Sequence, residues 1–131
     1  MVIVDTSVWI DYLRGTQNRH SDWIDRELAL QRIGLTDLIL CEVLQGITDD
    51  TAFRKVRRTL SQFEVFPTGG EALAVASASN YRRLRVEGRT VRKTIDCLIA
   101  TFCLVHGHSL FHRDSDFDAF EEHLQLRVIH P

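Results

Sequence analysis

The sequence predicts an α/β domain built on a mostly parallel sheet. Short apolar runs alternate with longer segments whose apolar residues recur at helical spacing, the pattern of a parallel sheet covered by helices. The first run, residues 1–4, is continuously apolar, as expected of a strand buried on both faces. A chain of 131 residues is long enough for one core, so we expect a single domain over residues 1–131.

The first half of the chain gives two strands and three helices in this order. After the strand at residues 1–4, apolar residues predict a helix over 8–13 that Gly15 ends. Trp23, Leu28 and Leu30 mark a second helix over 21–31. A short apolar strand follows at 33–35. Thr36 and Asp37 then provide a helix start, and an apolar stripe continues that helix to about residue 47.

The second half continues the alternation. Apolar residues at helical spacing predict a helix over 51–63, and a short strand at 65–66 precedes Pro67. An alanine-rich helix is expected over 71–86. The segment 94–105 is apolar almost all round, so we expect a buried helix there. The remaining expectations are a strand at 109–112, a helix that ends near His123 and a fifth strand at 126–129.

Composition excludes several classes of protein. The longest apolar stretch, 97–105, is far shorter than the ~20 residues that a membrane span needs, and no signal-like segment opens the chain. The three cysteines, Cys41, Cys97 and Cys103, are odd in number and have apolar neighbours. They indicate reduced core thiols, not a disulfide frame or a zinc site. We therefore expect a cytoplasmic protein that does not enter membranes.

Acidic residues stand at matching places in the expected fold. Asp5 and Asp114 each directly follow a strand, and the carboxyl ends of parallel strands meet at one edge of a sheet. Asp96 begins the helix that leads to the Asp114 strand, so antiparallel packing of helix on strand brings it to the same edge. Glu42 joins them if its helix face points there, and Asp116 is within reach as an outer ligand.

Three of these residues also have a purely structural interpretation. Asp5 is a good N-cap for the helix that follows it. Asp96 is favoured in a first helical turn by the helix dipole, and a glutamate inside a helix, such as Glu42, is usually solvated. The convergence of several carboxylates favours a functional site, because clustered like charges repel unless they surround a cation. All-oxygen ligands without histidine or cysteine indicate Mg²⁺ or Mn²⁺, which suits phosphoryl transfer or a nuclease.

A basic segment precedes Asp96. Residues 81–93 carry six arginines and lysines and one glutamate, a net charge of +5 in a chain of net charge −2. Such a segment can hold the phosphates of a nucleic acid, and its structural alternative is a solvated helix face. The basic segment comprises Arg82, Arg83, Arg85, Arg89, Arg92 and Lys93.

Four motifs in order resemble those of PIN-domain ribonucleases, in particular the VapC-type toxins of toxin–antitoxin modules. They are the residues 4–10, the isolated Glu42, the residues 96–100 and the residues 112–117. The resemblance spans the whole chain. It implies a PIN-like three-layer α/β/α sandwich with a five-stranded mostly parallel sheet and an endoribonuclease dependent on Mg²⁺ or Mn²⁺.

The resemblance also assigns residues and partners. It implies catalytic and metal-binding roles for Asp5, Glu42, Asp96 and Asp114, with Asp116 as a further metal ligand. Thr6 and Ser7 are expected to support the site by hydrogen bonding, and the basic segment to bind RNA. The implied partners are a cognate antitoxin, an RNA substrate and a second copy of the chain in a homodimer. His112 receives no role.

Other classes fit the sequence less well. A haloacid-dehalogenase-type phosphatase requires a second aspartate two residues after Asp5, where this chain has Ser7. A receiver domain requires a lysine at the end of the fifth strand, which is absent. A binding module that keeps the fold without the metal would be expected to lack one of the acids. A metal-independent ribonuclease would use histidines, but those outside position 112 lie at a helix end or in polar or terminal stretches.

Overall fold

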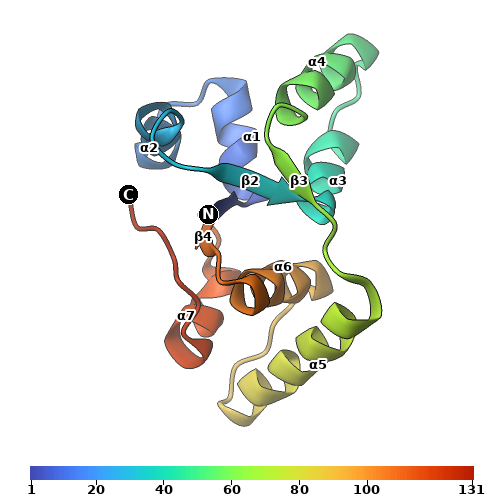
Figure 1. Cartoon of the computed structure of the whole chain (residues 1–131), viewed down its shortest axis with the longest axis vertical. Helices are drawn as coiled ribbons and strands as arrows, with labels where there is room; N and C mark the ends of the chain where they lie inside the picture. Colours follow the sequence, from blue (N-terminus) through green and yellow to red (C-terminus); the bar gives the residue numbers. More distant parts are fainter.

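The computed structural model describes residues 1–131 as an α/β fold with one central sheet (Figure 1). Its strands are β1 (Val2–Val4), β2 (Ile33–Thr36), β3 (Glu64–Phe66) and β4 (Ser109–Phe111). Its helices are α1 (Thr6–Arg14), α2 (Arg19–Glu27), α3 (Asp37–Gln45), α4 (Asp50–Leu60), α5 (Gly70–Val86), α6 (Thr94–His106), the short 3₁₀ helix η1 (Ser115–Phe117) and α7 (Asp118–Leu124).

All neighbouring strands run parallel, in the order β3-β2-β1-β4. The carboxyl ends of β1 and β4 therefore lie side by side, with Val4 paired to Phe111. Gly34 permits the close approach of β2 to β3, since an added Cβ would lie 2.9 Å from the carbonyl oxygen of Glu64. This arrangement brings the residues that follow β1 and β4 to one edge of the sheet.

The helices form a layer on each side of the sheet (Figure 1). Helices α1 to α4 cover one face, and α5, α6 and α7 cover the other. Central strand β1 is fully buried, with Ile3 and Val4 inaccessible to solvent, which explains its continuous apolar run. The three-layer α/β/α sandwich expected from the sequence is confirmed.

The expected fifth strand at 126–129 is wrong. Its backbone makes only two hydrogen bonds to β4, from Leu110 N–H to the Arg127 carbonyl oxygen (2.8 Å) and from Ile129 N–H to the Leu110 carbonyl oxygen (3.0 Å). These bonds form a single parallel bridge between Leu110 and Val128. The pairing does not extend beyond this bridge, and the sheet has four strands.

The bounds of two helices differ from the predicted bounds because capping side chains fix where each helix begins. Helix α2 begins earlier because Asn18 and Ser21 form a capping box. It ends at Glu27, so Leu28 and Leu30 do not extend its buried stripe, and Leu30 is 75% exposed. Helix α4 begins after the N-cap Asp49 and ends at Leu60, before the turn that leads into β3.

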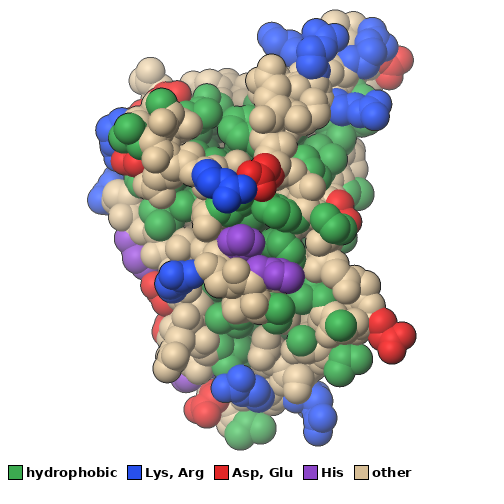
Figure 2. Space-filling model, viewed as in Figure 1, with side chains coloured by type: hydrophobic (Ala, Val, Ile, Leu, Met, Phe, Trp, Pro, Cys, Tyr) green, Lys and Arg blue, Asp and Glu red, His purple; other side chains and the backbone are tan.

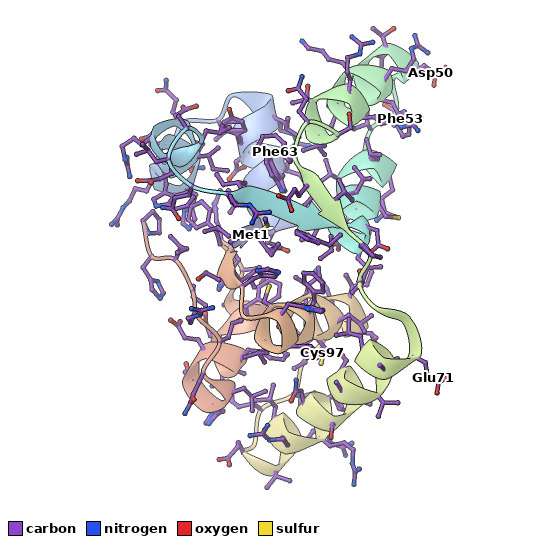
Figure 3. All side chains as sticks on the ribbon, viewed as in Figure 1. Met1, Asp50, Phe53, Phe63, Glu71 and Cys97 are labelled. Atoms are coloured by element: carbon purple, nitrogen blue, oxygen red, sulfur yellow. The ribbon has the colours of Figure 1, made fainter.

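Two of the three cysteines are core residues. Cys97 and Cys103 are buried, and burial raises the pKa of the Cys103 thiol to about 12. In Figure 3, Cys97 lies on α6 and faces α5, where its thiol contacts the Ser77 carbonyl oxygen at 3.3 Å. The expectation for Cys41 is wrong: it is exposed, because it occupies the solvent side of α3. None of the helices has the length and apolar composition that a membrane-spanning segment requires.

Candidate metal-binding active site

An acidic pocket of about 190 Å³ opens at the carboxyl edge of β1 and β4. Four carboxylates from separate parts of the chain reach it: the three that the expected topology brings together, and Glu42, which depended on the orientation of its helix. The pocket is lined by Asp5, Thr6, Ser7, Ile10, Glu42, Lys93, Asp96 and Asp114. Glu42 belongs to this group because α3 packs beside α1 and turns that position of the helix toward the pocket.

Asp5 is fixed by both neighbouring backbone and side chains. Its N–H donates to the Phe111 carbonyl oxygen at 2.9 Å, which ties it to β4. Its Oδ2 accepts from the hydroxyl of Ser7 at 2.8 Å and from the Ser7 N–H at 3.2 Å. Asp5 thus also caps α1 while it lines the pocket. Burial raises the pKa of Asp5 to about 6, although the Ser7 hydrogen bonds act in the opposite direction.

Asp96 is, like Asp5, a buried carboxylate of the pocket. It stands in the first turn of α6 and is only 4% exposed. Its Oδ2 is buried without a hydrogen-bond partner, a costly arrangement for a polar group. Burial, with the charges of Asp5 and Asp114, raises the pKa of Asp96 to about 7, while Lys93 acts in the opposite direction. A buried carboxylate oxygen without a hydrogen-bond partner, on a residue that lines a polar pocket, is suited to bind a cation.

Asp114 and Asp116 form the third side of the site. Ligand atoms of Asp96, Asp114 and Asp116 lie within 4.8 Å of one another. The Asp116 N–H donates to Oδ1 of Asp114 at 2.9 Å, which caps η1 and orients the Asp114 carboxylate. Asp116 was expected as an outer ligand, and it lies close to the other two without lining the acidic pocket itself.

Thr6 and Ser7 both make supporting hydrogen bonds, as expected. The Thr6 hydroxyl donates to Oε1 of Glu42 at 2.8 Å and so joins α1 to α3. The Ser7 hydroxyl, besides donating to Asp5, accepts from the Arg113 N–H at 3.2 Å. One pair of consecutive hydroxyls therefore orients two different carboxylates.

His112 has a positioning role that sequence reasoning missed. Its Nδ1 accepts a hydrogen bond from the Asp114 N–H at 3.1 Å, and burial lowers the pKa of the imidazole. A neutral ring keeps Nδ1 available as an acceptor. Its place between β4 and Asp114 was the available signal, but the contact depends on a ring orientation that no motif specifies.

The basic segment is divided by the structure. Arg92 donates to Oδ1 of Asp116 from Nε at 3.2 Å and from Nη2 at 2.7 Å. Arg89 pairs with Glu122, and the Arg85 guanidinium lies 5.9 Å from the centre of the Tyr81 ring. Arg82 and Arg83 are exposed and form no ion pair, and Arg82 borders a groove between α5 and α6. Lys93 lines the acidic pocket.

The donor set suits a hard divalent cation. The pocket offers only oxygen ligands, and neither histidine nor cysteine lines it. Mg²⁺ and Mn²⁺ prefer such ligands. A parallel sheet with a carboxylate pocket at its carboxyl edge thus defines an α/β protein equipped to bind a divalent cation.

The chain belongs to the PIN-domain family, whose model matches residues 2–122. It is 34% identical over 130 residues to the VapC ribonuclease Mb1587 of Mycobacterium bovis and, equally, to ribonuclease VapC11 of Mycobacterium tuberculosis. Each alignment covers 98% of this chain and 97% of the relative.

Solved structures share the fold at lower identity. VapBC2 from Rickettsia felis, bound to a DNA fragment, has a TM-score of 0.79 at 14% identity, covering 98% of each chain. FitAcB from Neisseria gonorrhoeae has a TM-score of 0.78 at 22% identity, covering 100% of this chain and 98% of the other. A toxin–antitoxin complex from Klebsiella pneumoniae has a TM-score of 0.73 at 19% identity, with the same coverage as FitAcB.

Proposed function

We propose that this protein is the toxin of a type II toxin–antitoxin module and acts as a divalent-cation-dependent endoribonuclease. The observation that carries the proposal is the convergence of Asp5, Glu42, Asp96 and Asp114 in one pocket. The identity of one third to two VapC ribonucleases supports RNA as the substrate. We assign metal binding to these four carboxylates and to Asp116, with Mg²⁺ or Mn²⁺ as the cation.

The residues of the chain prepare the site for hydrolysis. Ser7 and Thr6 hold Asp5 and Glu42 in fixed orientations, while His112 holds the backbone that carries Asp114. A divalent cation bound here would lower the pKa of the attacking water and neutralise charge on the scissile phosphate. Water attacks phosphorus, the bond to the 3′ oxygen breaks, and the products carry 5′-phosphate and 3′-hydroxyl ends.

One experiment tests this function. The purified protein is incubated with RNA in Mg²⁺ or in EDTA, beside an Asp5→Asn variant, and the product ends are identified. Cleavage that needs both the cation and Asp5 and leaves 5′-phosphates is expected. Cleavage in EDTA, or recovery of 2′,3′-cyclic phosphates, would indicate a metal-independent ribonuclease that attacks through the ribose 2′-hydroxyl.

Partners follow from the same proposal. A cognate antitoxin would cover the acidic pocket and inhibit the nuclease in trans, in keeping with the toxin–antitoxin complex that shares this fold. We further propose a homodimer, and the cytoplasm as the place of action, consistent with three unpaired cysteines. Expression without an antitoxin should arrest growth, and expression of the Asp5→Asn variant should not. Harmless expression of an active nuclease would argue against the toxin role.

A further inference from the structure

Lys93 is the one cation among the residues that line the acidic pocket. It faces a pocket that contains four carboxylates, so an ion pair with one of them would be the expected arrangement. Lys93 nevertheless forms no ion pair in the structure. Its ammonium group is therefore available to another anion.

The adjacent Arg92 behaves differently. Its guanidinium donates two hydrogen bonds to Asp116 and compensates the charge of that carboxylate. Arg89 is also occupied, through Glu122. Arg89 and Arg92 are therefore each paired with an acidic side chain, whereas Lys93 is not. Attraction to a nearby carboxylate alone does not explain why Lys93 lines the acidic pocket.

The backbone of Lys93 is held at the rim of the pocket. Lys93 is the N-cap of α6, in an extended conformation with φ −122° and ψ 125°. Its carbonyl oxygen accepts from the Cys97 N–H at 3.3 Å, and Val91 and Asp96 on either side of it are buried. The main chain is anchored while the exposed side chain can adjust to a ligand that enters the pocket.

We propose that Lys93 is a catalytic residue whose ammonium group binds a non-bridging oxygen of the scissile phosphate. This inference rests on the proposed ribonuclease function and deepens it. A phosphate oxygen is the anion that a cleaved RNA brings to this pocket, and lysine binds phosphate as a point charge. Because negative charge develops on the phosphate during displacement, the contact strengthens in the transition state.

The test compares Lys93→Gln with Lys93→Arg and with the matched control Lys55→Gln on exposed helix α4. Loss of Lys93 should lower kcat on the order of 100-fold, as removal of one donor to a developing oxyanion does. The KM of Lys93→Gln should change much less than its kcat. Lys93→Arg should retain most of the wild-type kcat, and Lys55→Gln should have the wild-type kcat and KM. Equal melting temperatures would show that the exposed substitution leaves the fold intact.

A binding measurement separates this inference from the proposed function. Calorimetry on the Mg²⁺-loaded protein compares a ribonucleoside 5′-monophosphate, which carries the phosphate of the product end, with the nucleoside that lacks it. The phosphate should raise affinity in the unchanged protein and in Lys55→Gln, but not in Lys93→Gln. An unchanged kcat, or an equal phosphate effect in Lys93→Gln, would overturn the role of Lys93. This binding measurement does not require cleavage, so it tests Lys93 even if the wild-type protein cleaves no RNA. Absence of cleavage by the wild-type protein would refute the proposed ribonuclease function.

Discussion

The acidic pocket and the basic segment lie next to each other but are fixed in different ways. Asp5 and Asp114 follow buried, paired strands, and Asp96 begins a helix whose core is buried. The arginines of the basic segment extend from an exposed helix end and loop, where they pair with nearby acids or remain free. Side chains on buried backbone converge as topology dictates, whereas exposed cations pair with a nearby acid or remain free.

Surface charge elsewhere supports this distinction. Helix α4 carries Arg54, Lys55, Arg57 and Arg58, all exposed, and Figure 2 shows the basic side chains gathered over it. None of them forms an ion pair. Arginine and lysine content therefore does not distinguish α4 from the basic segment. What distinguishes the basic segment is its continuity with the acidic pocket through Lys93.

The largest expected effect comes from Asp96→Asn. Cleavage should fall by more than about 1000-fold, and most of the Mg²⁺-induced rise in melting temperature should disappear, because the site loses a charged ligand. The metal-free protein should become more stable at pH 8, by at most about 4 kcal/mol for a pKa raised to about 7. A purely structural Asp96 would instead lose the roughly 0.3–1 kcal/mol of a helix-dipole interaction.

Asp50→Asn provides the matched control. Asp50 also stands in a first helical turn, at the exposed outer end of α4 (Figure 3). Its replacement should slightly destabilise the protein and leave both the Mg²⁺ response and cleavage unchanged. If Asp96→Asn melts lower without metal and still cuts RNA, Asp96 does not belong to the site.

The pH dependence of stability should separate the acidic pocket from surface carboxylates. Folding raises the pKa of Asp5 to about 6 and of Asp96 to about 7, above the unfolded value of about 3.9. A raised folded pKa stabilises the protein at low pH, and this contribution is lost as pH rises through the folded pKa. The free energy of unfolding of the metal-free protein should therefore fall between pH 5 and pH 8.

Denaturant titrations in EDTA and in Mg²⁺ measure this slope. Magnesium should stabilise the protein more at pH 8 than at pH 5, because it binds the ionised carboxylates. The slope in EDTA should be shallower in Asp96→Asn. A stability that rises over this range without metal, equally in both proteins, would contradict a crowded carboxylate pocket.

Removal of the Thr6 hydroxyl should have an intermediate effect. Thr6→Val deletes the donor to Glu42, which leaves that carboxylate less well oriented. Metal affinity should fall about 10- to 100-fold, as for other partners that orient ligands, measured as the Mg²⁺ concentration that half-saturates the melting-temperature shift.

Two variants check the Thr6 result. Thr6→Ser keeps the hydroxyl and should retain near-normal affinity. Thr59→Val removes a hydroxyl that bonds the Lys55 carbonyl oxygen on α4, and it should leave Mg²⁺ binding unaffected. Equal Mg²⁺ affinity in Thr6→Val and the unchanged protein would show that Glu42 is oriented without this bond.

The smallest effect is expected from the unpaired arginines of the basic segment. On an Asp5→Asn background that does not cleave, replacing Arg82 and Arg83 with glutamine should weaken RNA binding severalfold. The slope of log affinity against log salt should become shallower by about 1.4, at about 0.7 per phosphate contact to a single strand. Titrations at several salt concentrations measure both quantities.

The arginines that form ion pairs should contribute less to RNA binding. Replacing Arg89 and Arg92 removes cations that already pair with Glu122 and Asp116, so RNA affinity should change less than in the Arg82 and Arg83 variant. Equal losses in the two double variants would show that RNA displaces the ion pairs. No loss in either would make the basic segment a solvated helix face.

The residues alone predicted the fold class, the alternation of the first four strands with helices, and the convergence of Asp5, Asp96 and Asp114, while Glu42 depended on the orientation of its helix. Asp5 and Asp114 could be placed because a parallel sheet aligns its strand ends, and the continuous apolar run of β1 predicts burial on both faces. The position of Asp96 could be predicted because α6 was expected to pack antiparallel to β4. These inferences depend on backbone periodicity and topology, which local sequence encodes strongly.

The remaining features depend on how distant parts of the chain pack together. Whether residues 126–129 form a strand depends on how many backbone groups of β4 are available for pairing. Only one bridge forms. Cys41 was misplaced because its apolar neighbours in sequence lie on another face of α3. The hydrogen bond from Asp114 to His112, the Arg92 pair with Asp116 and the free Lys93 depend on side-chain rotamers and contacts between segments distant in the chain. Residue types and spacing do not specify these contacts, because they form only after segments distant in the chain have packed together.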